Sequence, residues 1–390
     1  MSWLLVVSCW LLEKENKINM TEKESKRYAR QISLPQFGKA GQEKLLSSSV
    51  LVIGAGGLGC PALLYLAGAG IGKIGVIDHD NVSLSNLHRQ TIYSVDHIGR
   101  NKAESAGEVL SALNPDIQIS VYPFALTSEN AWDIFSEFDV IIDGTDHFST
   151  RYMINDLSVL QNKPLVFAAV SGFEGQLSVF NYNSTIHYRD LFPNPPQEEL
   201  IPNCEEAGVL GAVPGIIGTM QALEAIKIIS GIGKTCSGQL FTYNGLTNET
   251  YSFDIPKSEV SDSLIPKDRK AFEKRDYILE CADPSKARFN IDLDFFDQWK
   301  DRDDVIIIDV REFGEQPEVD EFNHAKIPMS VFRDEMKGIK ENNVIIFCQV
   351  GQRSLIAART LSSYFSNTKK VYSLSGGIVN WKNSRVYERK

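Results

Sequence analysis

Apolar stretches of strand length alternate along the chain with segments of helical spacing, which is the pattern of a parallel α/β sheet. A helix is expected over Cys60–Ala69. Apolar residues at three- and four-residue spacing predict a second helix with a buried face: Ile216, Met220, Leu223, Ile226 and Ile229. The first two thirds of the chain should also contain the strands Ser49–Ile53, Lys73–Asp78, Phe138–Asp143 and Leu165–Val170, and a hairpin of Gln239–Gly245 with Glu249–Ile255.

A second α/β pattern follows a change of composition at Pro256. Residues 257–289 are rich in charge and contain the run Lys267-Asp-Arg-Lys270, which predicts a solvated linker. The predicted organisation is a first domain over residues 21–256, this linker, and a smaller domain over residues 290–390. Beyond the linker we expect the strands Val305–Asp309, Val344–Phe347 and Val371–Leu374, and a helix over Ser354–Tyr364.

Residues 1–20 are expected to lie outside the fold, as a tail or as the product of a start codon assigned before Met20. The apolar stretch Ser2–Leu12 is shorter than the about 20 residues that span a bilayer. No basic segment precedes it and no small-residue cleavage site follows, so we do not interpret it as a signal peptide.

Length, charge and cysteine content indicate the number of domains, exclude some binding partners and suggest the cellular compartment. At about 100–200 residues per domain, 390 residues should form two or three domains. The 40 Lys and Arg against 50 Asp and Glu give a net charge of −10, which argues against a binder of nucleic acid or of anionic membranes. The six cysteines are scattered and form no CxxC, so we expect a reducing, cytoplasmic location and no disulfide framework.

A glycine-rich motif lies where the first strand should meet the first helix. Gly54, Gly56 and Gly59 form GxGxxG, whose backbone can approach phosphate groups at a helix N-terminus. Asp78 follows 19 residues after Gly59, at the end of the next strand, where a carboxylate can bind ribose hydroxyls. These residues predict a nucleotide site, and by themselves they fit a nicotinamide-dependent dehydrogenase equally well.

The segment that begins at Asp78 favours a different chemistry. It reads DHDNVSLSNLHRQ and places acids, amides and Arg89 directly behind the ribose-binding position. Lys102 adds a second cation, and Asp143 and Asp146 add carboxylates that suit magnesium. Transfer of a phosphoryl or nucleotidyl group needs such charges to hold the phosphates, whereas hydride transfer does not.

Taken together, these motifs resemble those of the MoeB/ThiF/HesA adenylyltransferases, the bacterial relatives of ubiquitin-activating enzymes. The resemblance rests on Arg27-Tyr-Ala-Arg30-Gln31, the GAGGLG loop, DHDNVSLSNLHRQ, Lys102 and Gly144-Thr-Asp146, and it covers about Lys26 to Ile255. It implies a Rossmann-like domain of the ubiquitin-activating type with a mostly parallel sheet. It also implies ATP, Mg²⁺ and a small ubiquitin-like sulfur-carrier protein that ends in Gly-Gly. The carrier's carboxylate attacks the α-phosphate and gives an acyl adenylate and pyrophosphate.

The resemblance also implies roles for individual positions. Asn86, Arg89 and Lys102 would bind the phosphates, and Asp146 would bind magnesium. Arg30 would reach the triphosphate held by a neighbouring subunit, which implies a homodimer. The catalytic set would be Arg30, Arg89, Lys102 and Asp146. The nucleotide-binding set would be Gly54, Gly56, Gly57, Gly59, Asp78, Asp80, Ser85, Asn86, Arg89, Lys102, Asp146 and His147.

The chain departs from the family pattern at two places. Many relatives bind a structural zinc through two CxxC pairs. Here the first pair is replaced by His187-Tyr-Arg-Asp190 and no second cysteine pair exists, so no zinc site is predicted, because two ligands do not complete a tetrahedral site. His147 stands where relatives usually have asparagine, and we interpret it as a tolerated hydrogen-bond donor.

Cys204 is a tentative catalytic residue. It follows a proline-rich stretch, and in relatives a cysteine at this place can link covalently to the carrier or to a sulfur donor. The acids Glu205 and Glu206 beside it would raise its pKa, so structural and catalytic interpretations stay equally open. Cys60 and Cys236 are expected to be packing or incidental residues.

Cys348 carries a stronger signal. It follows a strand and opens Cys348-Gln-Val-Gly351-Gln-Arg353-Ser354, directly before a helix whose N-terminus favours a thiolate or persulfide anion. With Asp309-Val-Arg311-Glu312 before it and Ser375-Gly-Gly377 after it, this loop resembles the rhodanese active site over about Asn290 to Trp381. That resemblance implies a persulfide on Cys348 as sulfur carrier.

The sequence therefore predicts an adenylyltransferase fused to a rhodanese-like sulfurtransferase, which converts a carrier's carboxylate into a thiocarboxylate. The expected partners are the carrier and a sulfur donor such as a cysteine desulfurase. By analogy, molybdopterin-synthase activation ranks first, thiamine biosynthesis second, and tRNA thiolation is a further alternative. A nicotinamide-dependent oxidoreductase and a non-catalytic sulfur-relay scaffold stay open as different classes of function.

Overall fold

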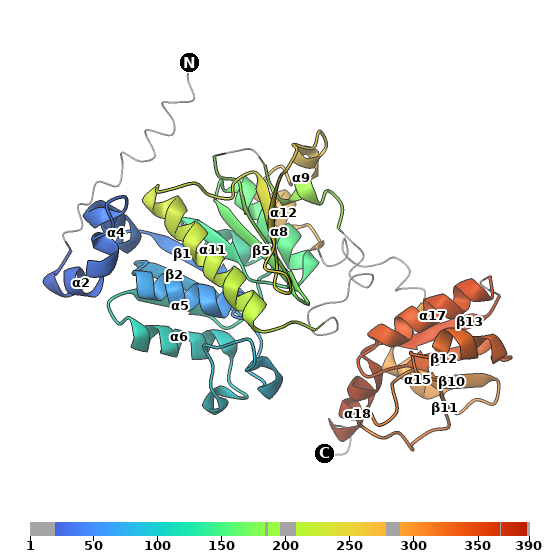
Figure 1. The fold of residues 1–390 in the computed structure, drawn as a ribbon. Helices are drawn as coiled ribbons and strands as arrows, with labels where there is room; N and C mark the ends of the chain where they lie inside the picture. Colours follow the sequence, from blue (N-terminus) through green and yellow to red (C-terminus); the bar gives the residue numbers. More distant parts are fainter. Residues whose placement is uncertain (1–19, 184–185, 196–207, 278–288, 367, 388–390) are drawn as a thin grey trace. The chain divides into compact units, whose positions relative to one another are not determined.

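The computed structural model of the chain describes residues 20–183, 186–195, 208–277, 289–366 and 368–387 (Figure 1). The described residues up to Tyr277 form one compact unit, and those from Phe289 onward form a second. The expected extension over residues 1–20, apart from Met20, lies outside the described residues.

A mixed eight-stranded sheet organises the first unit, in the order β3-β2-β1-β4-β5-β6-β7-β8. The pairings from β3 to β5 are parallel and those from β5 to β8 are antiparallel. Each strand foreseen in this part of the chain is present, whereas β3 and β6 were not predicted. The strands are β1 (Ser49–Ile53), β2 (Lys73–Ile77), β3 (Gln118–Tyr122), β4 (Val140–Asp143), β5 (Leu165–Ser171), β6 (Glu174–Phe180), β7 (Gln239–Asn244) and β8 (Thr250–Asp254).

Helices cover both faces of this sheet, and each face has its own apolar core. One core lies under α5, α6 and α11, and the other under α7, α8 and α12. Because β1 and β4 are buried on both faces, they consist almost entirely of branched apolar residues. The helices of this unit are α2 (Glu22–Arg27), α3 (Ala29–Ile32), α4 (Gly38–Leu46), α5 (Gly59–Ala69), α6 (Lys102–Leu113), α7 (Ala131–Ser136), α8 (Phe148–Leu160), α9 (Tyr188–Leu191), α11 (Ala212–Ser230) and α12 (Arg269–Glu273).

The second predicted helix of this unit exists as α11, but the prediction of its buried face was wrong. Ile216 and Leu223 are 41% and 52% exposed, whereas Ile217 and Ala225 on the other side are fully buried. The small residues of α11 face the sheet and α5, because the backbone of α11 lies close to the start of α5. A Cβ at Gly218 would lie 2.2 Å from the Leu58 carbonyl oxygen. Among the described residues, α11 is the one helix long and apolar enough to cross a membrane, and here it packs on α5, β5 and β6 (Figure 1).

The charged segment after Pro256 also differs from the expectation of a solvated linker. Ser261, Phe272 and Tyr277 are buried, and the two aromatic rings join the apolar core beside α7 and α8. The 3₁₀ turn η4 (Ser261–Leu264) packs beside α9 (Figure 1). Basic side chains of this segment form ion pairs with acidic side chains of the first unit. The described part of the segment, up to Tyr277, therefore belongs to that unit.

The second unit is a parallel five-stranded sheet in the order β11-β10-β12-β13-β9. One core lies between the sheet and α16 and α17, and another lies on the opposite face with Phe296 of α15 and Trp381 of α18. Its elements are β9 (Asn290–Ile291), α15 (Leu293–Trp299), β10 (Val305–Asp309), β11 (Ala325–Lys326), α16 (Phe332–Glu335), β12 (Asn343–Phe347), α17 (Gln352–Tyr364), β13 (Lys370–Leu374) and α18 (Gly377–Tyr387).

Candidate functional site

The first candidate site is a cavity of about 410 Å³ at the carboxyl ends of the parallel strands of the first unit. The strand order changes direction between β1 and β4, which is where ligands bind in open α/β sheets. The GAGGLG loop lies at this point. Gly54 has a φ of +90°, and a Cβ there would lie 2.8 Å from the Gly144 carbonyl oxygen. A Cβ on Gly59 would lie 1.9 Å from the Gly54 oxygen, so the loop is closed tightly over the start of α5.

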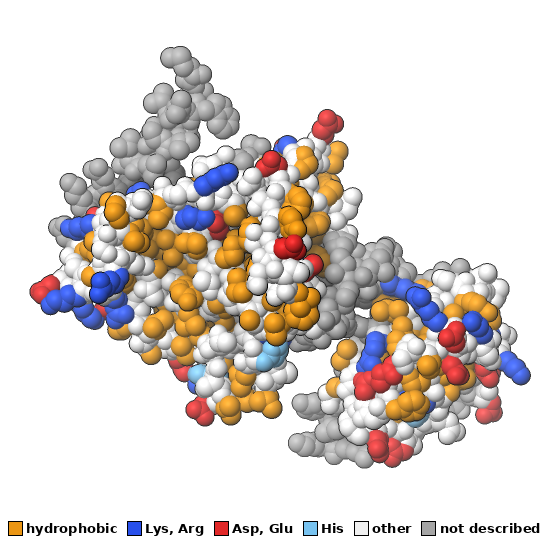
Figure 2. Space-filling view, in the orientation of Figure 1, with side chains coloured by type: hydrophobic (Ala, Val, Ile, Leu, Met, Phe, Trp, Pro, Cys, Tyr) orange, Lys and Arg blue, Asp and Glu red, His pale blue; other side chains and the backbone are white. Residues whose placement is uncertain are grey.

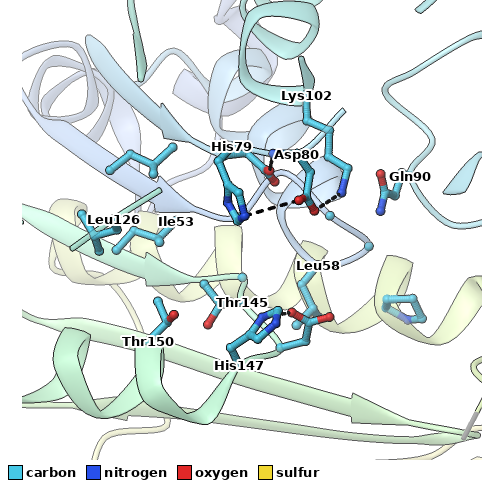
Figure 3. Close-up of a pocket in the computed structure, with 18 of the residues that line it drawn as sticks. Ile53, Leu58, His79, Asp80, Gln90, Lys102, Leu126, Thr145, His147 and Thr150 are labelled. Atoms are coloured by element: carbon cyan, nitrogen blue, oxygen red, sulfur yellow. Dashed lines mark hydrogen bonds and ion pairs between the residues drawn. The ribbon is translucent and has the colours of Figure 1, made fainter. Parts of the chain in front are cut away.

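Most of the predicted nucleotide-binding residues line this one cavity (Figure 3). Gly59 and Ser85 do not line it: Gly59 shapes the loop, and the Ser85 carbonyl accepts a hydrogen bond from Arg89. Arg30 also lies outside it, exposed on α3. The predicted residues in the lining are Gly54, Gly56, Gly57, Asp78, Asp80, Asn86, Arg89, Lys102, Asp146 and His147.

Asp78 at the end of β2 is held against the glycine loop. Its carboxylate accepts hydrogen bonds from the backbone N–H groups of Ala55, at 2.8 Å, and Asp80, at 2.9 Å. Burial raises the pKa of Asp78 above its usual value, and this outweighs the opposing effect of the Lys102 ammonium. The carboxylate therefore has a fixed position beside the loop and free lone pairs to accept hydrogen bonds from a ribose.

Lys102, the first residue of α6, places a nearly buried ammonium group in the cavity. Its Nζ lies 2.8 Å from a carboxylate oxygen of Asp80, and its side chain is 8% exposed. Figure 3 shows Asp80 between Lys102 and His79. Asp80 is half-exposed. A phosphate, which carries more negative charge, can therefore compete with Asp80 for the Lys102 ammonium group.

The 3₁₀ turn η1 (Leu84–Asn86) and the residues after it contribute the other phosphate-binding candidates. The Asn86 side chain is nearly buried and accepts a hydrogen bond from the Ser83 backbone N–H. Arg89 donates to the Ser85 carbonyl at 3.0 Å. Gln90, which the sequence analysis did not single out, also lines the cavity and is 3% exposed. Its Oε1 is buried and has no hydrogen-bond partner among the described residues.

Asp146 follows β4 on a turn that three elements hold in place. The Asp143 carboxylate accepts hydrogen bonds from the Thr145 backbone N–H and hydroxyl, and Arg151 of α8 donates to the Thr145 carbonyl. Gln221 of α11 donates to the Asp143 carbonyl at 2.7 Å. Asp143 is therefore a buried support and does not line the cavity, whereas Asp146 does.

His147 forms a hydrogen bond that favours the ionised form of Asp146. Its Nδ1 lies 2.9 Å from the Asp146 carboxylate, and this hydrogen bond is the main cause that lowers the pKa of Asp146 to about 2. An ionised, half-exposed carboxylate beside a phosphate site fits Mg²⁺, which takes one or two carboxylates and completes its shell with phosphate oxygens and waters. Asp146 is the residue that would hold the ion, and the ion would neutralise charge on the phosphates.

The second candidate site is the loop that follows β12 in the second unit. Cys348 is 1% exposed, and its Sγ accepts a hydrogen bond from the Gly351 backbone N–H at 3.2 Å. Gly351 has a φ of +98° and is the residue that precedes α17, so the loop turns sharply and aims the helix N-terminus at the sulfur. The Ser354 hydroxyl donates to the Gly351 carbonyl, which closes the loop on itself.

Arg353 is not a free cation in this loop. Its two terminal nitrogens each lie 2.6 Å from an oxygen of Glu315, a residue that the sequence analysis did not name. The ion pair with Glu315 is the largest cause that raises the pKa of Arg353, and the neighbouring Cys348 sulfur contributes less. Glu315 comes from the loop after β10, so no spacing rule within the Cys348 motif could have found it.

The remaining cysteines divide into two groups. Cys9, Cys204 and Cys281 lie outside the described residues, so the role of Cys204 stays a prediction. Burial raises the pKa of the Cys60 thiol to about 12 and that of Cys236 to about 11. Neither thiol has the character of a nucleophile, in agreement with the interpretation of these two as packing residues.

Comparison with known proteins finds two families in the chain. The ThiF family matches residues 28–264, and the rhodanese-like domain matches residues 292–384. A relative named probable adenylyltransferase/sulfurtransferase MoeZ, from Mycobacterium tuberculosis, is 37% identical and covers 93% of this chain and 94% of its own length. The adenylyltransferase and sulfurtransferase MOCS3 of Xenopus laevis is 36% identical over 95% of this chain and 89% of its own. A sulfur carrier protein adenylyltransferase of Thermus thermophilus is 48% identical over 58% of this chain and 85% of its own.

Solved structures share the fold of the first unit. E. coli MccB, in a crystal structure with ATP, has a TM-score of 0.51 and 20% identity, and the match covers 62% of this chain and 81% of MccB. PaaA has a TM-score of 0.51 and 23% identity over 65% of this chain and 81% of its own. At these identities the likeness shows the fold alone, a Rossmann-type α/β sheet.

Proposed function

Because this chain belongs to the ThiF family and carries a rhodanese-like domain, we propose that it adenylates the C-terminal carboxylate of a ubiquitin-like sulfur carrier and then exchanges one oxygen for sulfur. The supporting observation is the convergence of Lys102, Arg89, Asn86 and Asp146 on the cavity that contains the GAGGLG loop. Two cations and a metal-binding carboxylate serve a triphosphate whose α-phosphate is attacked. Hydride transfer would need neither the cations nor the metal-binding carboxylate.

The chain's own groups would act by positioning and by charge. Asp78 orients the ribose, and the glycine loop brings backbone N–H groups to the phosphates. A carboxylate is a weak nucleophile, so the rate depends on holding it in line with the α-phosphate while Lys102 and Arg89 neutralise the pyrophosphate that leaves. Asp146 would hold a Mg²⁺ ion at the phosphates, and that ion would supply further positive charge.

The sulfur step would use the second unit. A Cys348 persulfide anion attacks the carbonyl carbon of the acyl adenylate, AMP leaves with the electron pair of the broken C–O bond, and an acyl disulfide joins the carrier to Cys348. A second thiol then attacks the Cys348 sulfur, which releases the carrier as a thiocarboxylate and leaves a disulfide behind. Cys204 is the candidate for this thiol. The sulfur donor that loads Cys348 is proposed to be a protein persulfide such as that of a cysteine desulfurase.

A homodimer would complete the first site, because Arg30 is exposed and does not reach the cavity of its own chain. Hydrophobic side chains gather over α5 and α11 (Figure 2), where Tyr65, Ile216 and Leu223 are 59%, 41% and 52% exposed. We assign this apolar face to the subunit contact. Replacing Leu223 by aspartate should give monomers in sedimentation analysis with reduced activity, and full activity of a monomer would contradict the assignment.

Relatives named MoeZ and MOCS3 cover most of the chain, which favours activation of a molybdopterin-synthase carrier as the first choice of pathway. Thiamine and tRNA thiolation carriers are the alternatives. A cytoplasmic location is proposed with this pathway.

The test is ATP–pyrophosphate exchange by the full chain with magnesium and a panel of Gly-Gly carriers from the same genome. Exchange with one carrier would establish adenylation and identify the pathway, and mass spectrometry of that carrier would detect the replacement of oxygen by sulfur. An absence of exchange with every carrier would overturn the proposal. If NAD(H) then bound to the cavity, the oxidoreductase alternative would be favoured. Thiocarboxylate formation that survives Asp146→Ala would instead favour a non-catalytic relay.

A further inference from the structure

In this chain, the place of the first cysteine pair through which many relatives bind a structural zinc contains an ionic cluster with a buried centre and an exposed edge. It is formed by two stretches far apart in sequence, His187–Asp190 of the α9 turn and Lys257–Asp262 of the segment after β8. The side chains of His187 and Asp190 are 3% and 0% exposed. The cluster thus joins α9 to the charged segment that the sequence analysis assigned to a linker.

Asp190 is the centre of the cluster. One of its oxygens accepts hydrogen bonds from the Ser258 backbone N–H, at 2.9 Å, and the Ser261 hydroxyl, at 2.6 Å. The other oxygen accepts from the His187 backbone N–H, at 2.8 Å, and from the Lys257 ammonium, at 3.2 Å. Both oxygens are therefore already engaged by protein donors, and no lone pair is left pointing at an empty position.

Lys257 supplies the positive charge of the cluster. Its Nζ lies between the carboxylates of Asp190 and Asp262, at 3.2 Å and 2.7 Å. His187 contacts the same Asp262 oxygen through Nε2 at 3.0 Å. An ammonium group held by two carboxylates from separate stretches cross-links the chain as a divalent ion would, without thiolate or imidazole ligands.

The residues of the cluster do not fit zinc. A structural zinc ion needs four tetrahedral ligands, usually thiolates or imidazoles. His187-Tyr-Arg-Asp190 and Ser258-Glu-Val-Ser261 have the spacing of CxxC pairs, yet three of their four end residues have no nitrogen or sulfur ligand. Within the described residues of the cluster, the one fully buried side-chain polar atom without a hydrogen-bond partner is Nδ1 of His187. One ligand atom does not make a site.

We infer that Lys257, with Asp190 and Asp262, replaces the structural zinc of the family as a metal-free cross-link that fastens the segment after β8 to the α9 turn. A second buried carboxylate extends the same fastening: Asp156 of α8 binds Arg189 beside the cluster and Tyr277 at the end of the segment, at 2.7 Å and 3.0 Å. The segment is thus held at both ends by carboxylates of the first unit.

The experiment uses the full chain purified without a metal-binding tag. Zinc content is measured by plasma mass spectrometry, and the unfolding temperature is recorded with and without EDTA or a high-affinity zinc chelator. We expect far less than one zinc per chain and no change of the unfolding temperature on chelation. Stoichiometric zinc, or a fall of the unfolding temperature on chelation, would overturn the inference.

Two variants test the role of Lys257 itself. Lys257→Met keeps the aliphatic length and removes the charge, and it should lower the unfolding temperature by roughly 5 °C because Asp190 is left buried without its cation. Lys26→Met is the matched control: Lys26 pairs with Glu22 on an exposed helix surface and should leave the temperature unchanged. Equal effects of the two variants would show that Lys257 is not a cross-link. If Lys257→Met does not fold, Asp262→Asn, which removes only the exposed carboxylate, should give a smaller shift in the same direction.

Discussion

The two candidate sites are assembled in opposite ways. The loop from Cys348 to Ser354 is one continuous stretch between a strand and a helix. Bonds inside the stretch shape its turn, and the backbone N–H groups of Ile378 and Val379 donate to it from α18. The nucleotide cavity collects Gly54 after β1, Asp78 after β2 and Asp146 after β4, together with Lys102 at the start of α6. A continuous site is recognisable from spacing, whereas an assembled site depends on which strands lie next to each other.

The two sites also differ in the charges that surround their functional groups. In the cavity, burial raises the pKa of Asp78 while His147 lowers that of Asp146 to about 2, so the two carboxylates have different electrostatic surroundings. In the Cys348 loop, the single cation is already paired with Glu315. The cavity is therefore arranged to exchange ionic partners with a ligand, whereas the loop keeps its cation paired and offers the sulfur the Gly351 backbone N–H at a helix N-terminus.

The largest effect is expected from removing the sulfur of Cys348, which should separate the activities of the two sites. Cys348→Ala should abolish thiocarboxylate formation, because no persulfide can form, while ATP–pyrophosphate exchange stays at the level of the unmodified chain. Mass spectrometry of the carrier and the exchange assay measure the two activities separately. Cys236→Ala is the matched control, since a pKa raised to about 11 leaves that thiol protonated at neutral pH. Loss of exchange in Cys348→Ala would show that the two sites are not separate.

Asp146→Ala should have the converse effect. Exchange should fall roughly 100- to 1,000-fold, because a charged group that acts on the phosphates is lost. Loading of Cys348 with persulfide sulfur, followed by mass spectrometry of the protein, should be unchanged. Asp96→Ala, an exposed acid on the turn before α6, controls for a general loss of negative charge. Exchange within error of the unmodified protein would contradict the assignment of Asp146.

A smaller effect is expected from Glu315→Gln. The substitution leaves the Arg353 guanidinium without its carboxylate partner, so a net positive charge would lie beside Cys348 and increase the thiolate fraction. Alkylation of Cys348 by iodoacetamide at neutral pH should become faster, by roughly 2- to 10-fold. Glu321→Gln, which releases Lys382 elsewhere in the same unit, should leave the rate unchanged. A slower reaction in Glu315→Gln would mean that the ion pair holds Arg353 close to the sulfur.

The smallest effect concerns acid stability of the second unit. Burial is the largest influence on Asp309 and raises its pKa, but the bonds from Arg311 and Lys326 outweigh it, and the pKa lies below its usual value. Its contribution is therefore present above the unfolded pKa of about 3.9 and is lost as the pH falls through the lower folded value. Thermal unfolding of the full chain and of Asp309→Asn between pH 7 and pH 3 should show a difference that shrinks below about pH 4. A difference that is constant with pH would refute this.

Much of the fold follows from local pattern. β1, β10 and β12 are short runs of branched apolar residues, and their positions agree with the prediction to within a residue. β3 and β6 were missed because their residues alternate or mix polar and apolar character, and β6 is a strand because it pairs with β5 and β7. Periodicity also could not assign the faces of α11, since both sides of that helix are apolar and the choice between them is made by the close approach of α5.

The amino-acid sequence by itself determined the two α/β patterns, the glycine loop, the acid and cation positions near Asp78, and the Cys348 loop, because each of these depends on neighbouring residues and on backbone preferences. The tertiary structure decided which distant groups meet. Glu315 pairs with Arg353, Gln90 enters the cavity, and Lys257 reaches Asp190 only when separate elements pack together. Ion pairs and burial act through space, so these partners follow from packing and carry no signature in the spacing of residues along the chain.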